Sequence, residues 1–188
     1  IAVPGLTFRE GFQPELLTRV TFGVIADVKG TVMGDGRIAW GPQGVTSTGR
    51  FGTAGTDLAA AFGPVQGIAG TLAFDDLLAL RTAPGQVLTV KSINPGIEVT
   101  DGRVVFRTLS GTAVEVASGR WPFAGGTLTL EPTTLDFGQD AARRMTFTVS
   151  GAAADKFLAQ FDFANLNATG TFDGTLPMVF DASGGRVE

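Results

Sequence analysis

The side chains that most often carry out catalysis or bind metals are missing from this sequence. Its 188 residues include no histidine, cysteine or tyrosine, which excludes imidazole and thiol chemistry, zinc–thiolate sites and disulfides. Catalysis would have to rely on Ser, Lys, Asp or Glu, and none of the spacings GxxxxGK[ST], GxSxG or the EF-hand loop occurs. We therefore expect a protein that is not an enzyme and that needs no metal and no cofactor.

Two acidic motifs remain, and both favour a structural interpretation. Asp75 and Asp76 are adjacent, so in a strand they would point to opposite faces and would not converge as a glycosidase pair. We interpret them as a turn or a helix cap. Asp136-Phe137-Gly138 spells the metal-binding triplet of protein kinases, but no catalytic-loop motif accompanies it. It is interpreted as a turn.

The distribution of charged and apolar residues limits which partners we expect. The net charge is −4, and no basic cluster exceeds the pair Arg143-Arg144, so we expect no nucleic-acid partner. No apolar run approaches 18 residues, which predicts no transmembrane segment. The sequence begins at Ile1 without an initiator Met or a signal peptide. We expect residues 1–188 to form a single β-rich domain, an internal fragment of a larger protein.

Apolar residues and glycine are abundant, and their order is typical of strands. Hydrophobic residues make up 44% of the chain and charged residues only 17%, with 15 Phe and 27 Gly. Residues 127–130 and 145–149 alternate Thr with apolar side chains, as half-buried strands do. Asp-Gly pairs recur at 35–36, 101–102 and 173–174, with a related Gly-Gly at 184–185, and such pairs favour hairpin turns. The fold class predicted is mainly all-β: a long curved antiparallel sheet of repeated hairpins, folded into an apolar groove.

Three segments interrupt the strand pattern. Residues 152–161 and 56–62 contain good helix formers, and each is predicted to form a short helix at an end or edge of the sheet. A helical turn is expected at residues 15–17, after Pro14.

Strand alternation also selects the apolar residues of one face. We predict that this face lines the groove, although a shift of one residue in any strand would reverse its assignment. The groove candidates are Leu72, Phe74, Leu88, Val90, Val104, Phe106, Leu128, Leu130, Met145, Phe147, Val149, Phe172 and Leu176.

Several stretches of the sequence are similar to one family of bacterial envelope proteins. Together they span most of positions 57–188, and they resemble the YdbH family, which belongs with the AsmA-like proteins and has TamB as a relative. The stretches are residues 92–97, 101–102, 120–128, 163–170 and 172–177.

The resemblance implies a long β-sheet protein that is anchored in the inner membrane and crosses the periplasm of a Gram-negative bacterium. It implies a sheet that carries phospholipid acyl chains along an apolar channel toward the outer membrane. It also implies pairing with a small outer-membrane lipoprotein by strand addition, and it transfers no catalytic residue to this chain.

Two other functions fit the sequence less well. The sheet could be a structural or assembly module of the envelope, which a sealed core without a cavity would favour. It could also be a carrier for dicarboxylates, which a pocket with two or more of Arg37, Arg103, Arg107 and Arg120 would favour.

Overall fold

Most of the described chain lies in one antiparallel sheet. The computed structural model describes residues 1–17, 25–60, 63–94, 97–138, 142–161, 168–181 and 184–188. The sheet has 13 strands. Their bounds are β1 (Ala2–Phe8), β2 (Ile25–Gly41), β3 (Gly44–Ala60), β4 (Gly63–Asp76), β5 (Arg81–Thr82), β6 (Gln86–Ile93), β7 (Val99–Thr108), β8 (Ala113–Phe123), β9 (Gly126–Leu130), β10 (Thr133–Asp136), β11 (Arg143–Ala153), β12 (Thr171–Asp181) and β13 (Gly184–Val187).

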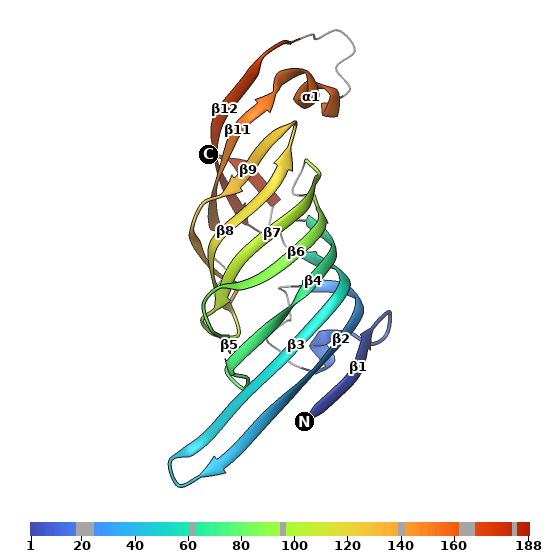
Figure 1. Ribbon diagram of the computed structural model, residues 1–188, viewed down its shortest axis with the longest axis vertical. Coiled ribbons are helices and arrows are strands. Elements are labelled where there is room, and N and C mark those ends of the chain that lie inside the picture. Colours follow the sequence, from blue (N-terminus) through green and yellow to red (C-terminus); the bar gives the residue numbers. More distant parts are fainter. Residues whose placement is uncertain (18–24, 61–62, 95–96, 139–141, 162–167, 182–183) are drawn as a thin grey trace.

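The strands follow one another in space almost as they do in sequence. The order across the sheet is β1-β2-β3-β4-β6-β7-β8-β9-β11-β12-β13, while the short strands β5 and β10 pair with β4 and β8. Figure 1 shows this succession along the long axis, from β1 near the N-terminus to β12 at the other end. Such a meander confirms the predicted sheet of consecutive antiparallel strands.

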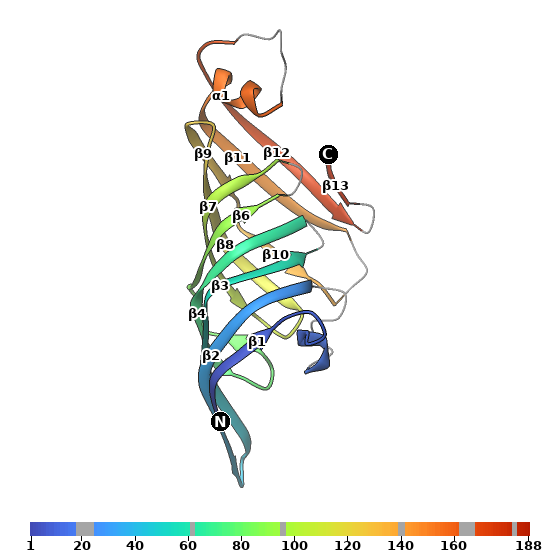
Figure 2. The same cartoon turned by 90° about the vertical axis from the view of Figure 1, so that its right-hand side faces the viewer.

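The sheet is curved, so that it has an inner and an outer face. Seen from the side, the strands curve toward one side of the sheet (Figure 2), and we call its concave side the trough. β-Bulges interrupt the register between β2 and β3, β3 and β4, β7 and β8, and β11 and β12. Bulges bend a strand and increase its twist, so these irregularities help the long sheet to curl.

The Asp-Gly pairs do not form hairpin turns, which corrects the sequence prediction. Asp35-Gly36 lies inside β2, Asp101-Gly102 inside β7 and Asp173-Gly174 inside β12. At two of the three pairs the glycine makes room on the sheet surface, since a Cβ at Gly36 would come within 2.8 Å of Leu77 and one at Gly102 within 2.0 Å of Trp121. The related Gly184-Gly185 opens β13, and Ser183 before it lies outside the described residues.

The actual tight turns use other residues. The β8–β9 hairpin turns at Ala124-Gly125, both with positive φ (47° and 82°), the conformation that right-handed strand twist favours. The β2–β3 hairpin turns at Pro42-Gln43, between the register pair Gly41 and Gly44.

Two of the three helix predictions are confirmed. The 3-10 helix η1 (Pro14–Leu16) follows the expected proline, and α1 (Ala154–Leu158) continues into η3 (Ala159–Phe161). The helix predicted over 56–62 is wrong: residues 56–60 belong to β3, and 61–62 lie outside the described residues. β3 is paired on both sides here, and the two ladders override a weak local helix propensity.

Candidate functional site

A row of apolar side chains crosses the inner face of the sheet. Register pairs connect Leu88 to Val104, Val104 to Gly119 and Gly119 to Leu130, and then Leu130 to Phe147 and Phe147 to Leu176. Six strands from β6 to β12 thus place apolar side chains or glycine side by side on one face. Because alternate residues of a strand share a face, the Thr residues between them point outward.

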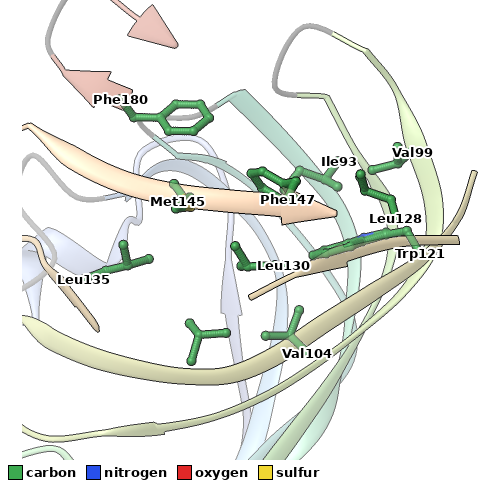
Figure 3. A pocket seen from close by; sticks show the side chains of 11 residues that line it. Ile93, Val99, Val104, Trp121, Leu128, Leu130, Leu135, Met145, Phe147 and Phe180 are labelled. Atoms are coloured by element: carbon green, nitrogen blue, oxygen red, sulfur yellow. The ribbon is translucent and has the colours of Figure 1, made fainter. Parts of the chain in front are cut away.

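Two neighbouring hollows lie over this row. The first has a volume of about 150 Å³ and the second about 280 Å³, and Val99, Leu128 and Phe147 line both. Only apolar side chains line either of them. Figure 3 shows the first hollow, which is lined by Ile93, Val99, Val104, Val116, Trp121, Leu128, Leu130, Leu135, Met145, Phe147 and Phe180. The second adds Ile97, Phe123, Leu176 and Met178.

Trp121 forms the floor of the first hollow. A Cβ at Gly102 would meet its indole at Nε1, and a Cβ at Gly119 would meet the opposite end of the ring. The indole therefore lies across two glycines, one on β7 and one on its own strand. Trp121 is 5% exposed, and its Nε1 has no hydrogen-bond partner among the described residues, so this apolar surface contains one unpaired donor.

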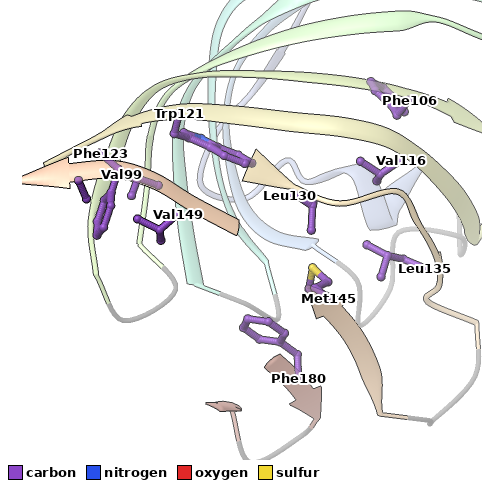
Figure 4. Close-up of a cluster of buried hydrophobic side chains, with 11 residues drawn as sticks. Val99, Phe106, Val116, Trp121, Phe123, Leu130, Leu135, Met145, Val149 and Phe180 are labelled. Carbon is purple, nitrogen blue, oxygen red and sulfur yellow. The ribbon is translucent and has the colours of Figure 1, made fainter. Parts of the chain in front are cut away.

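The structure brings most of the predicted groove residues together. Those in the hydrophobic cluster, or packed directly against it (Figure 4), are Leu72, Leu88, Val104, Phe106, Leu128, Leu130, Met145, Phe147, Val149 and Phe172. Leu176 is 38% exposed and lines the second hollow. Val90 is buried outside the cluster, and Phe74 packs edge-to-face on Phe51 with ring centroids 6.2 Å apart.

Other residues of the site were not among the predicted ones. The largest is Trp121, which alternates with the outward Arg120 in a pattern that the sequence does contain. Val116 and Phe106 form a register pair only because of a bulge in β8, and a strict period of two does not reveal such a shift. Phe180 closes the cluster from β12.

The short helix α1 covers one end of the inner face. Phe157 on this helix packs edge-to-face against Phe123, at 5.9 Å between centroids, and against Phe172 at 5.3 Å. The helix follows the end of β11 at the upper end of the molecule (Figure 1). This agrees with the prediction that the helix lies at an end of the sheet.

The four arginines of the dicarboxylate hypothesis lie on the outer face. Arg103 and Arg120 are a register pair, and both are exposed without lining any of the hollows described. Arg107 forms an ion pair with Glu115 at 2.8 Å. Arg37 lies on the β2–β3 hairpin, well away from the other three in the sheet order. No apolar hollow brings two of them together in the part of the chain described.

The acidic motifs have the structural roles expected of them. Asp76 Oδ1 accepts hydrogen bonds from Ser47 Oγ at 2.8 Å and from the Ala79 N–H at 3.2 Å, and Arg81 pairs with both Asp75 and Asp76. The Ser47 hydroxyl, then the Ala79 amide and the Arg81 charge, lower the pKa of the Asp76 carboxyl. Asp136 Oδ1 accepts the Gly138 N–H, which makes that triplet a turn.

Neither a metal cluster nor a membrane-spanning helix is found within the described ranges. No group of three or more acidic residues there is arranged to hold a metal ion. None of the described helices is long and apolar enough to cross a bilayer.

Comparison with models of known protein families gives a match over the whole chain. The model of the YdbH-like family, described as "Intermembrane phospholipid transport protein YdbH", matches residues 1–188. There is no significant match among the curated proteins or among the solved structures.

Proposed function

Because the chain belongs to the YdbH-like family, whose general role is the transport of lipid within the envelope, we propose that its inner face is a segment of a lipid-conducting bridge. Phospholipid acyl chains slide along the apolar trough while the head group stays in water. The bridge spans the periplasm and connects the inner and outer membranes.

The observation that carries this proposal is the continuous apolar row from Leu88 to Leu176, with hollows lined by apolar side chains alone. Moving a diacyl lipid through water exposes on the order of 30 methylenes, at roughly 0.8 kcal/mol each. A continuous apolar wall removes most of that barrier. The row supplies such a wall without requiring a catalytic group or a cofactor.

The proposal extends to the ends of the bridge. The full-length protein is anchored in the inner membrane, and an open edge of the sheet pairs with a small outer-membrane lipoprotein by strand addition. The antiparallel sheet supports this part, because strand addition extends a sheet of this kind at an edge. An unpaired edge offers its N–H and C=O groups to an added strand.

Native mass spectrometry of the chain, purified without detergent, tests acyl binding. We expect co-purifying phospholipid in stoichiometric amount. A lipid-free, monodisperse protein that also ignores added fluorescent phospholipid would mean that the inner face is closed. The sheet would then act as a scaffold of the envelope.

A matched pair of variants shows which face binds. Leu128→Lys places a charge in both hollows, whereas Thr129→Lys places the same charge on the opposite face of the same strand. We expect Leu128→Lys to lose the bound lipid and to block lipid transfer in the full-length protein, and Thr129→Lys to keep both. Circular dichroism of each variant shows whether the sheet is intact. Normal transfer by a folded Leu128→Lys variant would contradict the proposal.

A further inference from the structure

The hairpin of β2 and β3 extends beyond the rest of the sheet (Figure 1). Its last backbone bond with the segment of β1 joins the Gly36 N–H to the Ile1 carbonyl, and its last register pair with β4 is at Gly49. The turn after β4 still bonds to Ser47. From there to the turn at Pro42-Gln43, the two strands pair only with each other among the described residues. We call residues 36–49 the hairpin tip.

The inner face of the hairpin tip is apolar and exposed. Trp40 and Val45 are a register pair, 77% and 51% exposed, so the tip presents an uncovered apolar patch. Leu78 is 63% exposed and donates its N–H to Ser47 Oγ at the base of the tip, next to this patch. A tryptophan this exposed is unusual, because the residue normally buries most of its ring.

The outer face of the hairpin tip is polar and basic. Arg37, Thr46 and Thr48 line a shallow hollow of about 270 Å³ there. The sequence from 36 to 49 contains Arg37 as its only charged residue and no acid, although the chain as a whole has a net charge of −4. The tip is therefore an amphipathic projection with one positive charge, that of Arg37, and the register pair at its base, Asp35 and Arg50, carries opposite charges.

We propose that the hairpin tip docks on the surface of a bilayer that contains anionic phospholipid. Trp40 and Val45 enter the interfacial region, and Arg37 with the neighbouring hydroxyls meets the phosphate groups. Tryptophan is enriched at the membrane–water interface, where its ring is half apolar and half polar, and anionic lipids attract basic residues next to an apolar anchor.

The position of the tip on the sheet also fits a membrane contact. Its apolar face continues into the inner face of the trough through the register pair Phe51 and Leu72 and through Phe74, which packs on Phe51. A lipid leaving the bilayer at the tip thus meets the apolar face directly. Docking itself does not depend on acyl binding in the trough, so the two proposals can fail separately.

Vesicle binding of the 188-residue chain tests the docking. Vesicles of phosphatidylcholine with and without phosphatidylglycerol are mixed with the protein and sedimented. We expect binding to the phosphatidylglycerol vesicles that weakens with salt, with a blue shift of tryptophan emission that is absent in Trp40→Phe. Trp121 is already buried, so Trp40 is the tryptophan that changes its surroundings.

Paired variants separate the tip from the rest of the surface. We expect Arg37→Glu and Trp40→Ser each to reduce partitioning about tenfold or more. The controls are Arg103→Glu, the same charge reversal on the outer face of β7, and Leu16→Ser, an apolar side chain 65% exposed outside the tip. Both controls should bind as the unmodified chain does.

Three results would overturn the inference: no vesicle binding, binding that ignores phosphatidylglycerol, or binding that survives both tip substitutions. The last would point to a different surface, the second to a contact in which Arg37 does not recognise anionic lipid, and the first to a protein partner for the patch. Tip variants should still co-purify with lipid if the trough binds acyl chains. Leu128→Lys should still bind vesicles, so a failure of one proposal is distinguishable from a failure of the other.

Discussion

At the scale of single residues, the inner face depends on where glycine allows a large side chain to lie flat. Trp121 covers Gly102 and Gly119, and its indole lines the first hollow. Neither Gly102 nor Gly119 has a positive φ, so backbone conformation does not require glycine at these positions. Glycine is required because the Trp121 ring lies too close for a Cβ. An added methyl group would lift the ring into the space that the hollow occupies.

We predict that Gly102→Ala destabilises the protein by about 1–3 kcal/mol, the usual cost of overpacking a filled site. The new Cβ would lie 2.0 Å from Trp121 Nε1. Gly174→Ala is the control, since that glycine, also inside a strand, has nothing within 4 Å of the Cβ position. Urea unfolding followed by tryptophan fluorescence measures both, and equal stability of the two variants would rule out the packing argument.

A second prediction concerns pH and the base of the hairpin tip. The Ser47 hydroxyl is the largest cause of the lowered pKa of Asp76, so Ser47→Ala should raise the pKa of this carboxyl toward that of an ordinary Asp. A carboxyl with a lowered pKa in the folded state stabilises the fold above its unfolded pKa. That stabilisation is lost as the pH falls through the folded value. Carbon-detected NMR titration of Asp76 in both proteins measures the shift, and an unchanged pKa would contradict this assignment.

At the scale of elements, the sequence predicts strand content and facing well and turns poorly. Alternation correctly predicts strands at Thr127–Leu130 and Met145–Val149. The register between them then places their apolar side chains on the same face. The Asp-Gly pairs mislead because the same residues that favour turns also suit bulges and close contacts. Asp101, for instance, has a φ of 56° inside β7. Which face is covered depends on partners far along the chain, and local pattern does not contain that information.

The short helix offers a test at the same scale. Phe157→Ala removes the side chain that joins α1 to Phe123 and Phe172, and we expect a loss of about 1–3 kcal/mol, because the ring is only partly buried. Lys156→Ala is the control, because the Lys156 side chain, next to Phe157 in the sequence, is exposed. Thermal unfolding of the two variants measures the difference. An effect of Lys156→Ala as large as that of Phe157→Ala would mean that the helix is not held by these ring contacts.

At the scale of the whole molecule, the two halves of the sheet are not equally packed. The main hydrophobic cluster takes its buried residues from Val99 to Phe180, whereas β2 and β3 together bury only Val28, Gly36, Ser47 and Thr56. In a meander each strand depends mainly on its two neighbours, so stability varies along the chain much as it does in repeat proteins.

Hydrogen exchange should reveal this gradient. We predict the slowest amide exchange in β8, β9 and β11, which carry much of the cluster, and faster exchange toward the tip of the β2–β3 hairpin. Mass spectrometry of peptic fragments after timed exchange measures it. Uniform protection from β1 to β12 would show instead that the sheet opens as one cooperative unit.

The meander also allows the length of the sheet to change in regular steps. Neighbouring strands lie about 4.8 Å apart, so each additional hairpin lengthens the trough by roughly 10 Å across its strands without changing its cross-section. A closed barrel cannot gain hairpins without changing its diameter, because closure links its strand number to its cross-section. Among the described residues β1 does not pair with β13, so this sheet has no closure to satisfy. If the proposed bridge exists, its length can therefore change in steps, by gain or loss of hairpins, while the apolar row on the inner face keeps its register.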